Sequence, residues 1–172
     1  MDSFVTPMVL RAIHILSGVL WVGAAVFLSF FLMPSLRGAG PGAAGVMQQL
    51  VLTRRLPIWM MGATVLTILS GIALYWRDSA GFGSAWLGSG QARVFGLGGL
   101  LAIVAAAVGM GVSAPSGRRI ATLMSQAAGR APTAAEAEEM QRLQAKMAAA
   151  ARFVSVLVLL ATLAMAVARY VP

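Results

Sequence analysis

Four long apolar stretches constrain the fold more than any other feature of this sequence. They cover Met8–Met33, Ile58–Trp76, Ala92–Val112 and Phe153–Tyr170. Each is close to the roughly 20 residues that an α-helix needs to cross a hydrocarbon core about 30 Å thick. Only 10% of the 172 residues are charged, whereas charged residues make up about a quarter of a typical soluble domain. The sequence therefore predicts an all-α, polytopic membrane protein that forms a single domain, a bundle of four transmembrane helices.

The first apolar stretch is expected to remain in the protein as a membrane span. Met8–Met33 is too long for the apolar region of a signal peptide, and no small-residue cleavage site clearly ends it. The third stretch is rich in glycine and alanine, and it carries two series of small residues at four-residue spacing, Gly98–Ala102–Ala106 and Ala105–Gly109–Ser113. Such faces let membrane helices approach closely, which predicts that this span lies in the middle of the bundle.

Lysine and arginine are distributed unequally between the two ends of the predicted bundle. The end with the first and third loops carries nine of them, and the end with both termini and the second loop carries four: Arg11, Arg77, Arg93 and Arg169. The positive-inside rule then places the first and third loops in the cytoplasm and both termini outside a bacterial inner membrane. This distribution also accounts for the net charge of +8 without a nucleic-acid partner, because the cations flank apolar segments and form no basic stripe.

The loop between the third and fourth spans is predicted to form a cytoplasmic helical hairpin over about residues 117–150. Thr133-Ala-Ala-Glu136 has the pattern of a capping box and opens a helix that continues into the fourth span. Arg118–Ala128 has the periodicity of a second amphipathic helix. Pro115-Ser-Gly117 predicts a bend between that helix and the third span.

His14 is the only histidine of the chain, and it lies inside the first span. Arg11 precedes it by one helical turn, so the two side chains share a face. An ionisable residue inside a membrane span marks a functional site by default. The alternative is an interfacial histidine that is hydrogen-bonded to a neighbouring helix or to water. Both interpretations stay open on the sequence alone.

Residues at the depth of His14 on the other three spans suggest a site for a planar tetrapyrrole. Counting 1.5 Å per residue from the outer surface reaches Ser70 and Gly71, Gly98 and Gly99, and Met165 at that level. A haem needs an imidazole for its iron, close backbone approach and cations for its propionates. The sequence thus predicts haem b with His14 as metal ligand and Met165 as a second axial ligand, flanked by Gly71, Gly98, Arg11, Arg93 and Arg169. Alternatively, the glycines serve helix packing and the arginines anchor the protein at the interface.

The residue inventory excludes most other chemistry. The chain has no cysteine, and none of its five carboxylates lies within a predicted span. No acid pair, nucleophile–base pair or phosphate-binding loop is present, which argues against hydrolysis, phosphoryl transfer and proton-relay transport. If the protein is an enzyme, it is therefore expected to be an oxidoreductase that acts through a bound haem. Four methionines, Met33, Met60, Met61 and Met110, offer thioethers for Cu(I), although such methionines more often serve as packing.

The first span also carries a family resemblance. Ile13-His14-Ile-Leu-Ser-Gly-Val-Leu-Trp21-Val-Gly23, followed by Met33-Pro34-Ser-Leu36, resembles the CopD/HemJ-like group of small bacterial membrane proteins. That resemblance implies a bundle of four or five helices, with the first-helix histidine linked to haem b. HemJ-type proteins are associated with protoporphyrinogen oxidation and with a lysine on a later helix near the haem. This sequence departs from that pattern, because the third span begins with Arg93 and the only lysine is Lys146.

Three functions are consistent with these observations. The first is a haem-b-associated protein with a redox or haem-handling role through His14. The second is a non-catalytic accessory or scaffolding subunit, in a homo-oligomer or a larger membrane complex, which the small-residue faces and the helical hairpin favour. Copper handling is the third.

Overall fold

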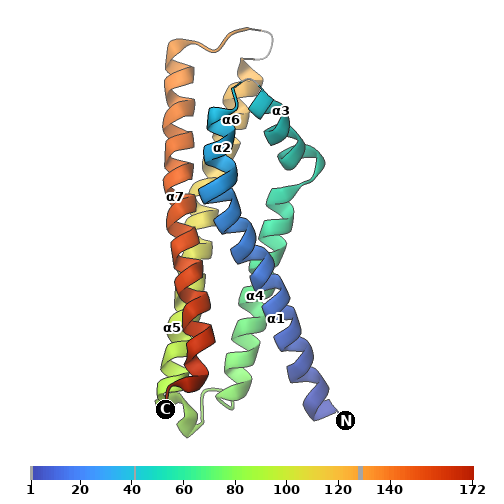
Figure 1. Cartoon of the computed structure of the whole chain (residues 1–172), viewed down its shortest axis with the longest axis vertical. Coiled ribbons are helices and arrows are strands. Elements are labelled where there is room, and N and C mark those ends of the chain that lie inside the picture. The colour runs from blue at the N-terminus through green and yellow to red at the C-terminus, as the bar shows by residue number, and fades with distance from the viewer. Residues whose placement is uncertain (1, 41, 128–129) are drawn as a thin grey trace.

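The computed structural model describes residues 2–40, 42–127 and 130–172, which form an up-down-up-down bundle of helices (Figure 1). Among these residues, four helices are long and apolar enough to cross a membrane. Large hydrophobic side chains are exposed along all four, for example Leu16 at 67% and Leu163 at 59%. Such surfaces are stable in lipid and not in water. The predicted all-α, multi-pass membrane fold is therefore confirmed.

Each span belongs to a longer helical element. The elements are α1 (Asp2–Phe27), η1 (Leu28–Leu32) and α2 (Met33–Gly38), then α3 (Gly42–Gln48), η2 (Gln49–Thr53) and α4 (Leu56–Asp78), then η3 (Ala85–Gly88), α5 (Gly90–Val108), η4 (Gly109–Ser113) and α6 (Ala114–Gln126), and finally α7 (Ala134–Val167) and η5 (Ala168–Tyr170). Both chain ends lie at one end of the bundle, and the connections α2–α3 and α6–α7 lie at the other (Figure 1).

The helix runs without interruption from Gly90 to Gln126, so the chain is not broken at Pro115-Ser-Gly117, where we predicted a bend. Pro115 lies in the first turn of α6, directly after the π-helical segment η4. Pro34 has the same arrangement in α2, directly after the π-helical η1. Proline lacks an N–H and crowds the preceding turn. A wider π-helical turn just before each proline makes room for the ring and for the missing hydrogen bond, so the helix stays continuous.

The four helices form two tightly packed pairs, α1 with α4 and α5 with α7, which also contact each other. Glycine makes one of these pairings close, because a Cβ on Gly98 would lie 3.2 Å from the carbonyl oxygen of Ala161 in α7. We expected the third span in the middle of the bundle, but the fourth span is more buried. In the most apolar part of each span, 28% of the fourth is buried and 17% of the third. The small residues of α5 thus serve one close pairing and do not place the helix centrally.

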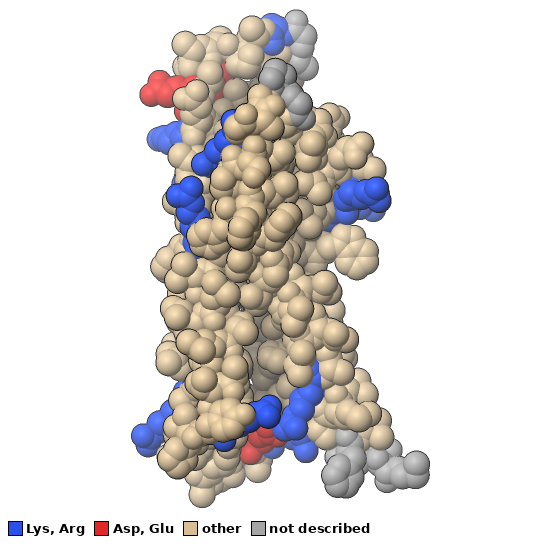
Figure 2. All heavy atoms as spheres, viewed as in Figure 1, with Lys and Arg blue, Asp and Glu red and all other residues tan. Residues whose placement is uncertain are grey.

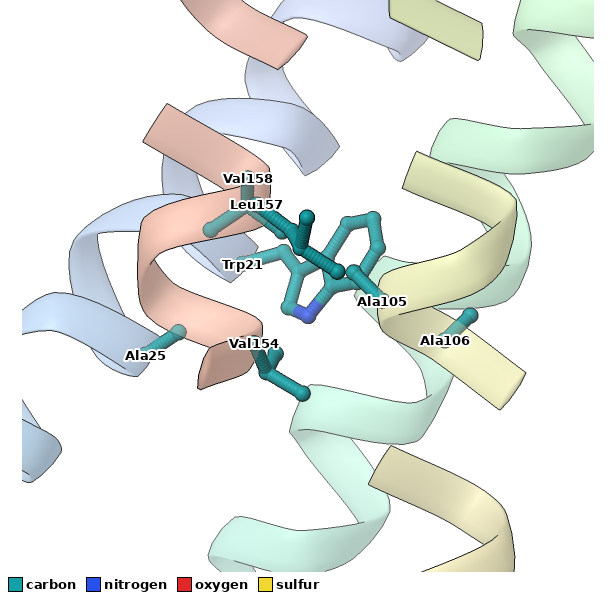
Figure 3. Packing of buried hydrophobic residues seen from close by; sticks show 7 residues of the cluster. All are labelled: Trp21, Ala25, Ala105, Ala106, Val154, Leu157 and Val158. Atoms are coloured by element: carbon teal, nitrogen blue, oxygen red, sulfur yellow. The ribbon is translucent and has the colours of Figure 1, made fainter. Parts of the chain in front are cut away.

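Trp21 fills the centre of the bundle, where the two pairs meet. Only 4% of its surface is exposed, and its ring lies among short side chains of α5 and α7, as Figure 3 shows. The surrounding cluster consists of Ala25, Ala105, Ala106, Val154, Leu157 and Val158. Below it, the hydroxyl of Ser155 in α7 lies 2.9 Å from the Ser29 hydroxyl and 2.9 Å from the Ala25 carbonyl oxygen. These contacts hold α1 against α7.

The predicted helical hairpin corresponds to α6 and the first half of α7, which pack side by side beyond the spans (Figure 1). We call these two segments, 114–126 and 134–150, the helical arm. Arg119 donates two hydrogen bonds to the Glu139 carboxylate, at 2.8 and 3.0 Å, and Leu123 is buried between the segments. Both segments are continuous with a span, so the arm is an extension of the bundle. Ala128, at the end of the predicted amphipathic stretch, lies outside the described residues.

The capping box at the start of α7 is confirmed and includes an arginine that we did not anticipate. The Thr133 hydroxyl accepts from the Glu136 N–H, and the Glu136 carboxylate accepts from the Thr133 N–H. Arg130 also donates to both Glu136 oxygens, at 2.6 and 2.7 Å. The hydrogen bonds from Arg130 and then from Thr133 lower the pKa of Glu136 from 4.5 to about 2.

This ion pair predicts how the arm responds to acid. Because the folded pKa is depressed, its stabilising contribution is complete above the ordinary pKa of 4.5 and is lost as the pH falls through about 2. NMR titration of the Glu136 carboxyl carbon should therefore give a midpoint near 2. In Arg130→Gln the midpoint should move up toward the ordinary value. A native midpoint in the ordinary glutamate range would contradict the ion pair.

Candidate functional site

A line of polar side chains runs between α1 and α4 inside the membrane-spanning region, and His14 lies at one end of it. His14 Nδ1 is 2.8 Å from the backbone carbonyl oxygen of Thr67 and 3.3 Å from the hydroxyl oxygen of Ser70. A carbonyl oxygen only accepts hydrogen bonds, so Nδ1 carries the proton and donates it to Thr67. In the neutral ring, Nε2 then keeps a free lone pair.

The remaining polar side chains in this line are buried, and their hydroxyls are hydrogen-bonded to one another or to backbone carbonyls. The Thr67 hydroxyl lies 2.9 Å from the Ser17 hydroxyl oxygen across the helix interface. Ser17 also donates to the Ile13 carbonyl oxygen at 2.6 Å, within its own helix. Ser17, Thr67 and Ser70 are all buried, with 6%, 8% and 6% of their surface exposed. We call His14, Ser17, Thr67 and Ser70 the polar seam. Because three of its hydrogen-bonding contacts cross between α1 and α4, it holds the two helices in a fixed register.

Gly71 provides the space for the His14 ring. A Cβ at this position would lie 2.8 Å from Cε1 of His14 and 3.2 Å from Nδ1, which is too close for any side chain. The imidazole therefore lies directly against the α4 backbone. Gly18 in α1 faces the same seam, because its Cβ would lie 3.6 Å from Cγ2 of Thr67. The predicted proximity of Gly71 to His14 is confirmed.

The structure does not bring the whole predicted haem set together. A Cβ on Gly98 would lie 3.1 Å from the Cε of Met165 and 3.3 Å from the Cβ of Ala164, so Gly98 and Met165 belong to the α5–α7 pair. His14 belongs to the α1–α4 pair. Toward the chain ends, α1 diverges from α7 (Figure 1), and a narrow furrow separates the two pairs in the lower half of Figure 2. Gly98 and Met165 thus contact each other, but His14 and Met165 lie in different helix pairs.

The four arginines at the end with the termini are exposed, and two of them flank a carboxylate. Arg11 Nη2 lies 3.8 Å from Asp78 Oδ2, and Arg77 Nη1 lies 3.4 Å from Asp78 Oδ1. Arg93 and Arg169 are exposed at the same end. Charged side chains flank the lower end of the furrow in Figure 2. The Arg11–Asp78 pair joins α1 to α4 next to the seam, so this arginine has a structural role besides any ligand contact.

Sequence reasoning placed Ser70 at the level of His14 but missed Thr67, whose carbonyl oxygen accepts the hydrogen bond from the ring. Thr64, Thr67 and Ser70 recur every three residues and are all buried, and this spacing on one face of a helix was the available signal. The Asp78 partner of Arg11 was also missed. Both omissions concern pairings between spans, which the pattern within a single span does not contain.

The copper interpretation receives no geometric support. Met60 packs against the core cluster, whereas Met61 is 56% exposed and Met110 54% exposed on the outside of the bundle. Cu(I) needs several soft ligands that converge on one point, and these thioethers face different ways. Among the described residues there is also no group of three or more His, Asp or Glu side chains that could hold a metal ion.

The fold and the seam define a class of protein: a multi-pass membrane bundle with one histidine hydrogen-bonded between two of its spans. Comparison with known proteins adds nothing to that class, because no family model, curated protein or solved structure matches this chain.

Proposed function

We propose that the protein is a haem-b-associated membrane protein with a redox or haem-handling role, in which His14 is the iron ligand through Nε2. The observation that carries this proposal is the 2.8 Å hydrogen bond from His14 Nδ1 to the Thr67 carbonyl oxygen. Histidines that bind metals commonly donate their other ring N–H to a backbone carbonyl, which fixes the tautomer and the ring orientation. The likeness of the first span to the CopD/HemJ-like group supports the same assignment.

The residues around His14 fit such a group in three respects. Nδ1 donates to Thr67 and leaves Nε2 for the iron, Gly71 keeps the ring seated against α4, and the exposed Arg11, Arg93 and Arg169 lie at the end where propionates would need cations. Haem would supply one-electron chemistry there. The chain's own residues hold and orient the imidazole. Met165 packs on Gly98 in the other helix pair, so we assign the iron to His14 alone.

We further propose that both termini face outward across a bacterial inner membrane. The end that carries the helical arm and the α2–α3 connection holds nine of the 13 basic residues: Arg37, Arg54, Arg55, Arg118, Arg119, Arg130, Arg142, Lys146 and Arg152. The positive-inside rule assigns that end to the cytoplasm. His14 then lies in the outer half of the membrane.

The visible absorption spectrum of the purified protein tests the haem proposal. We expect a Soret band after haem supplementation, and its loss in His14→Ala, because the alanine variant removes the only imidazole. Met165→Leu is the matched control and should keep the band. A protein without a Soret band after supplementation would refute haem binding. An unchanged band in His14→Ala would exclude this histidine as the ligand.

A second candidate function is supported by the helical arm. The 34 residues of α7 extend about 51 Å at 1.5 Å per residue, well beyond a hydrocarbon core of about 30 Å. An ordered arm of this length suits an accessory or scaffolding subunit that docks a partner outside the membrane. Purification in mild detergent would show a defined complex that depends on residues 114–150. A stable monomer under all mild conditions would count against this function.

A further inference from the structure

A narrow hollow lies between α2 and α7, at the end of the bundle that carries the helical arm (Figure 1). Its volume is about 20 Å³, enough for one group of the size of a water molecule or a phosphate oxygen. Side chains of both helices line it, among them Met33, Pro34, Arg37, Ala148, Ala151 and Arg152. Two arginines from different helices therefore border one small opening.

Neither of these arginines has an acidic partner. None of the ion pairs in the described part of the chain includes Arg37 or Arg152, and both side chains are exposed. The nearest carboxylate along α7 is Glu139, about 20 Å away at 1.5 Å per residue and already bonded to Arg119. Charges interact over only about 8 Å at physiological ionic strength. The protein does not neutralise the opening, which therefore attracts an anion.

The hollow lies at the level of lipid headgroups. Arg152 directly precedes Phe153, where the apolar stretch of the fourth span begins, and Arg37 comes four residues after Met33, where that of the first span ends. Both arginines thus lie at the boundary between the hydrocarbon core and the polar layer of the membrane. The phosphates of membrane lipids lie in that layer, so they are the anions nearest to the hollow.

An exposed apolar stripe runs from Arg152 into the membrane. Val156, Leu159 and Leu163 follow Arg152 by 4, 7 and 11 residues, so they share its face of α7. They are 46%, 46% and 59% exposed. Because α7 enters its span after Arg152, this stripe lies on the membrane side of the cation. A ligand with an anionic head and an apolar chain matches both the opening and the stripe.

We propose that this hollow binds the phosphate of one anionic phospholipid between Arg37 and Arg152, with an acyl chain along Val156 and Leu159. The lipid belongs to the leaflet on the side of the helical arm. Basic pockets between membrane helices bind anionic headgroups in this way, and each arginine near the surface strengthens the attraction roughly fivefold. The site is separate from His14 and does not depend on the proposed haem.

Native mass spectrometry of the full chain, titrated with phosphatidylglycerol or phosphatidylcholine, tests the proposal. We expect one phosphatidylglycerol to be retained in preference to phosphatidylcholine. Arg37→Gln and Arg152→Gln should each weaken that preference roughly fivefold, whereas Arg152→Lys keeps the charge and should keep most of it. Arg118→Gln, which removes an exposed arginine of α6 that does not line the hollow, is the matched control and should change nothing.

Three results would overturn the proposal. Equal retention of the two lipids would show that the hollow does not select for charge. A preference unchanged in both glutamine variants would place the lipid elsewhere on the protein. Complete displacement of the lipid by millimolar glycerol 3-phosphate would show that the arginines bind a free phosphate and that the apolar stripe contributes nothing. Because the two arginines belong to different helices, a folding defect in one variant leaves the other variant as the test.

Discussion

Replacing Trp21 with alanine is expected to lower the free energy of unfolding by about 3–5 kcal/mol, the largest effect of any single truncation in this protein. The indole is 4% exposed and is surrounded by Ala25, Ala105 and Ala106. Helix association in a membrane depends on van der Waals packing, because lipid is as apolar as the core. Alanine neighbours cannot extend to fill the space that the ring would leave, so those contacts would be lost outright.

Trp59→Ala is the matched control for this prediction. The Trp59 side chain is 74% exposed at the start of α4, and its truncation should change stability by about 0.5 kcal/mol or less. Unfolding in mixed micelles with increasing dodecyl sulfate, followed by circular dichroism, measures both variants. Similar losses for Trp21→Ala and Trp59→Ala would contradict the central packing of Trp21.

Features encoded within one segment were predictable from the sequence. The apolar length of each span and the Thr133–Glu136 capping box depend only on residues close together in the chain, and the structure confirms both. Distance along a helix was also predictable, because the rise per residue of a helix is constant. That constant is why counting inward from the outer surface brought Gly71 to the level of His14.

Features that depend on the rotation and pairing of helices were not predictable. Gly98 and Met165, which we counted to the depth of His14, face each other across the α5–α7 interface. Counting residues gives the position of a side chain along its helix. It does not show which neighbouring helix that side chain contacts. Trp21 lies in the same span as His14, but the structure uses it to join the two helix pairs, a role that its own segment does not encode. The uninterrupted helix through Pro115 was also not predicted, because a π-helical turn accommodates the proline.

Gly71→Ala is expected to displace the His14 imidazole and to lower the free energy of unfolding by about 1–3 kcal/mol, the cost of overpacking a tight interface. The added Cβ would lie 2.8 Å from Cε1 of His14 and 3.2 Å from Nδ1, so the ring must leave its position. Nδ1 would then lose its hydrogen bond to the Thr67 carbonyl oxygen. The same substitution therefore tests both the packing of α1 on α4 and the orientation of the only imidazole.

Gly62→Ala separates this effect from a general dependence on glycine in α4. A Cβ at Gly62 would meet no atom within 4 Å, and alanine is the better helix former by up to about 1 kcal/mol, so this variant should be as stable as the parent or slightly more so. The ¹⁵N chemical shifts of the imidazole report the tautomer, which should be Nδ1–H in the parent and in Gly62→Ala. They should change in Gly71→Ala. If Gly71→Ala kept the chemical shifts and the stability of the parent, the imidazole would not lie against Gly71. The hydrogen bond from Nδ1 to Thr67, on which the proposed iron ligand depends, would then be contradicted as well.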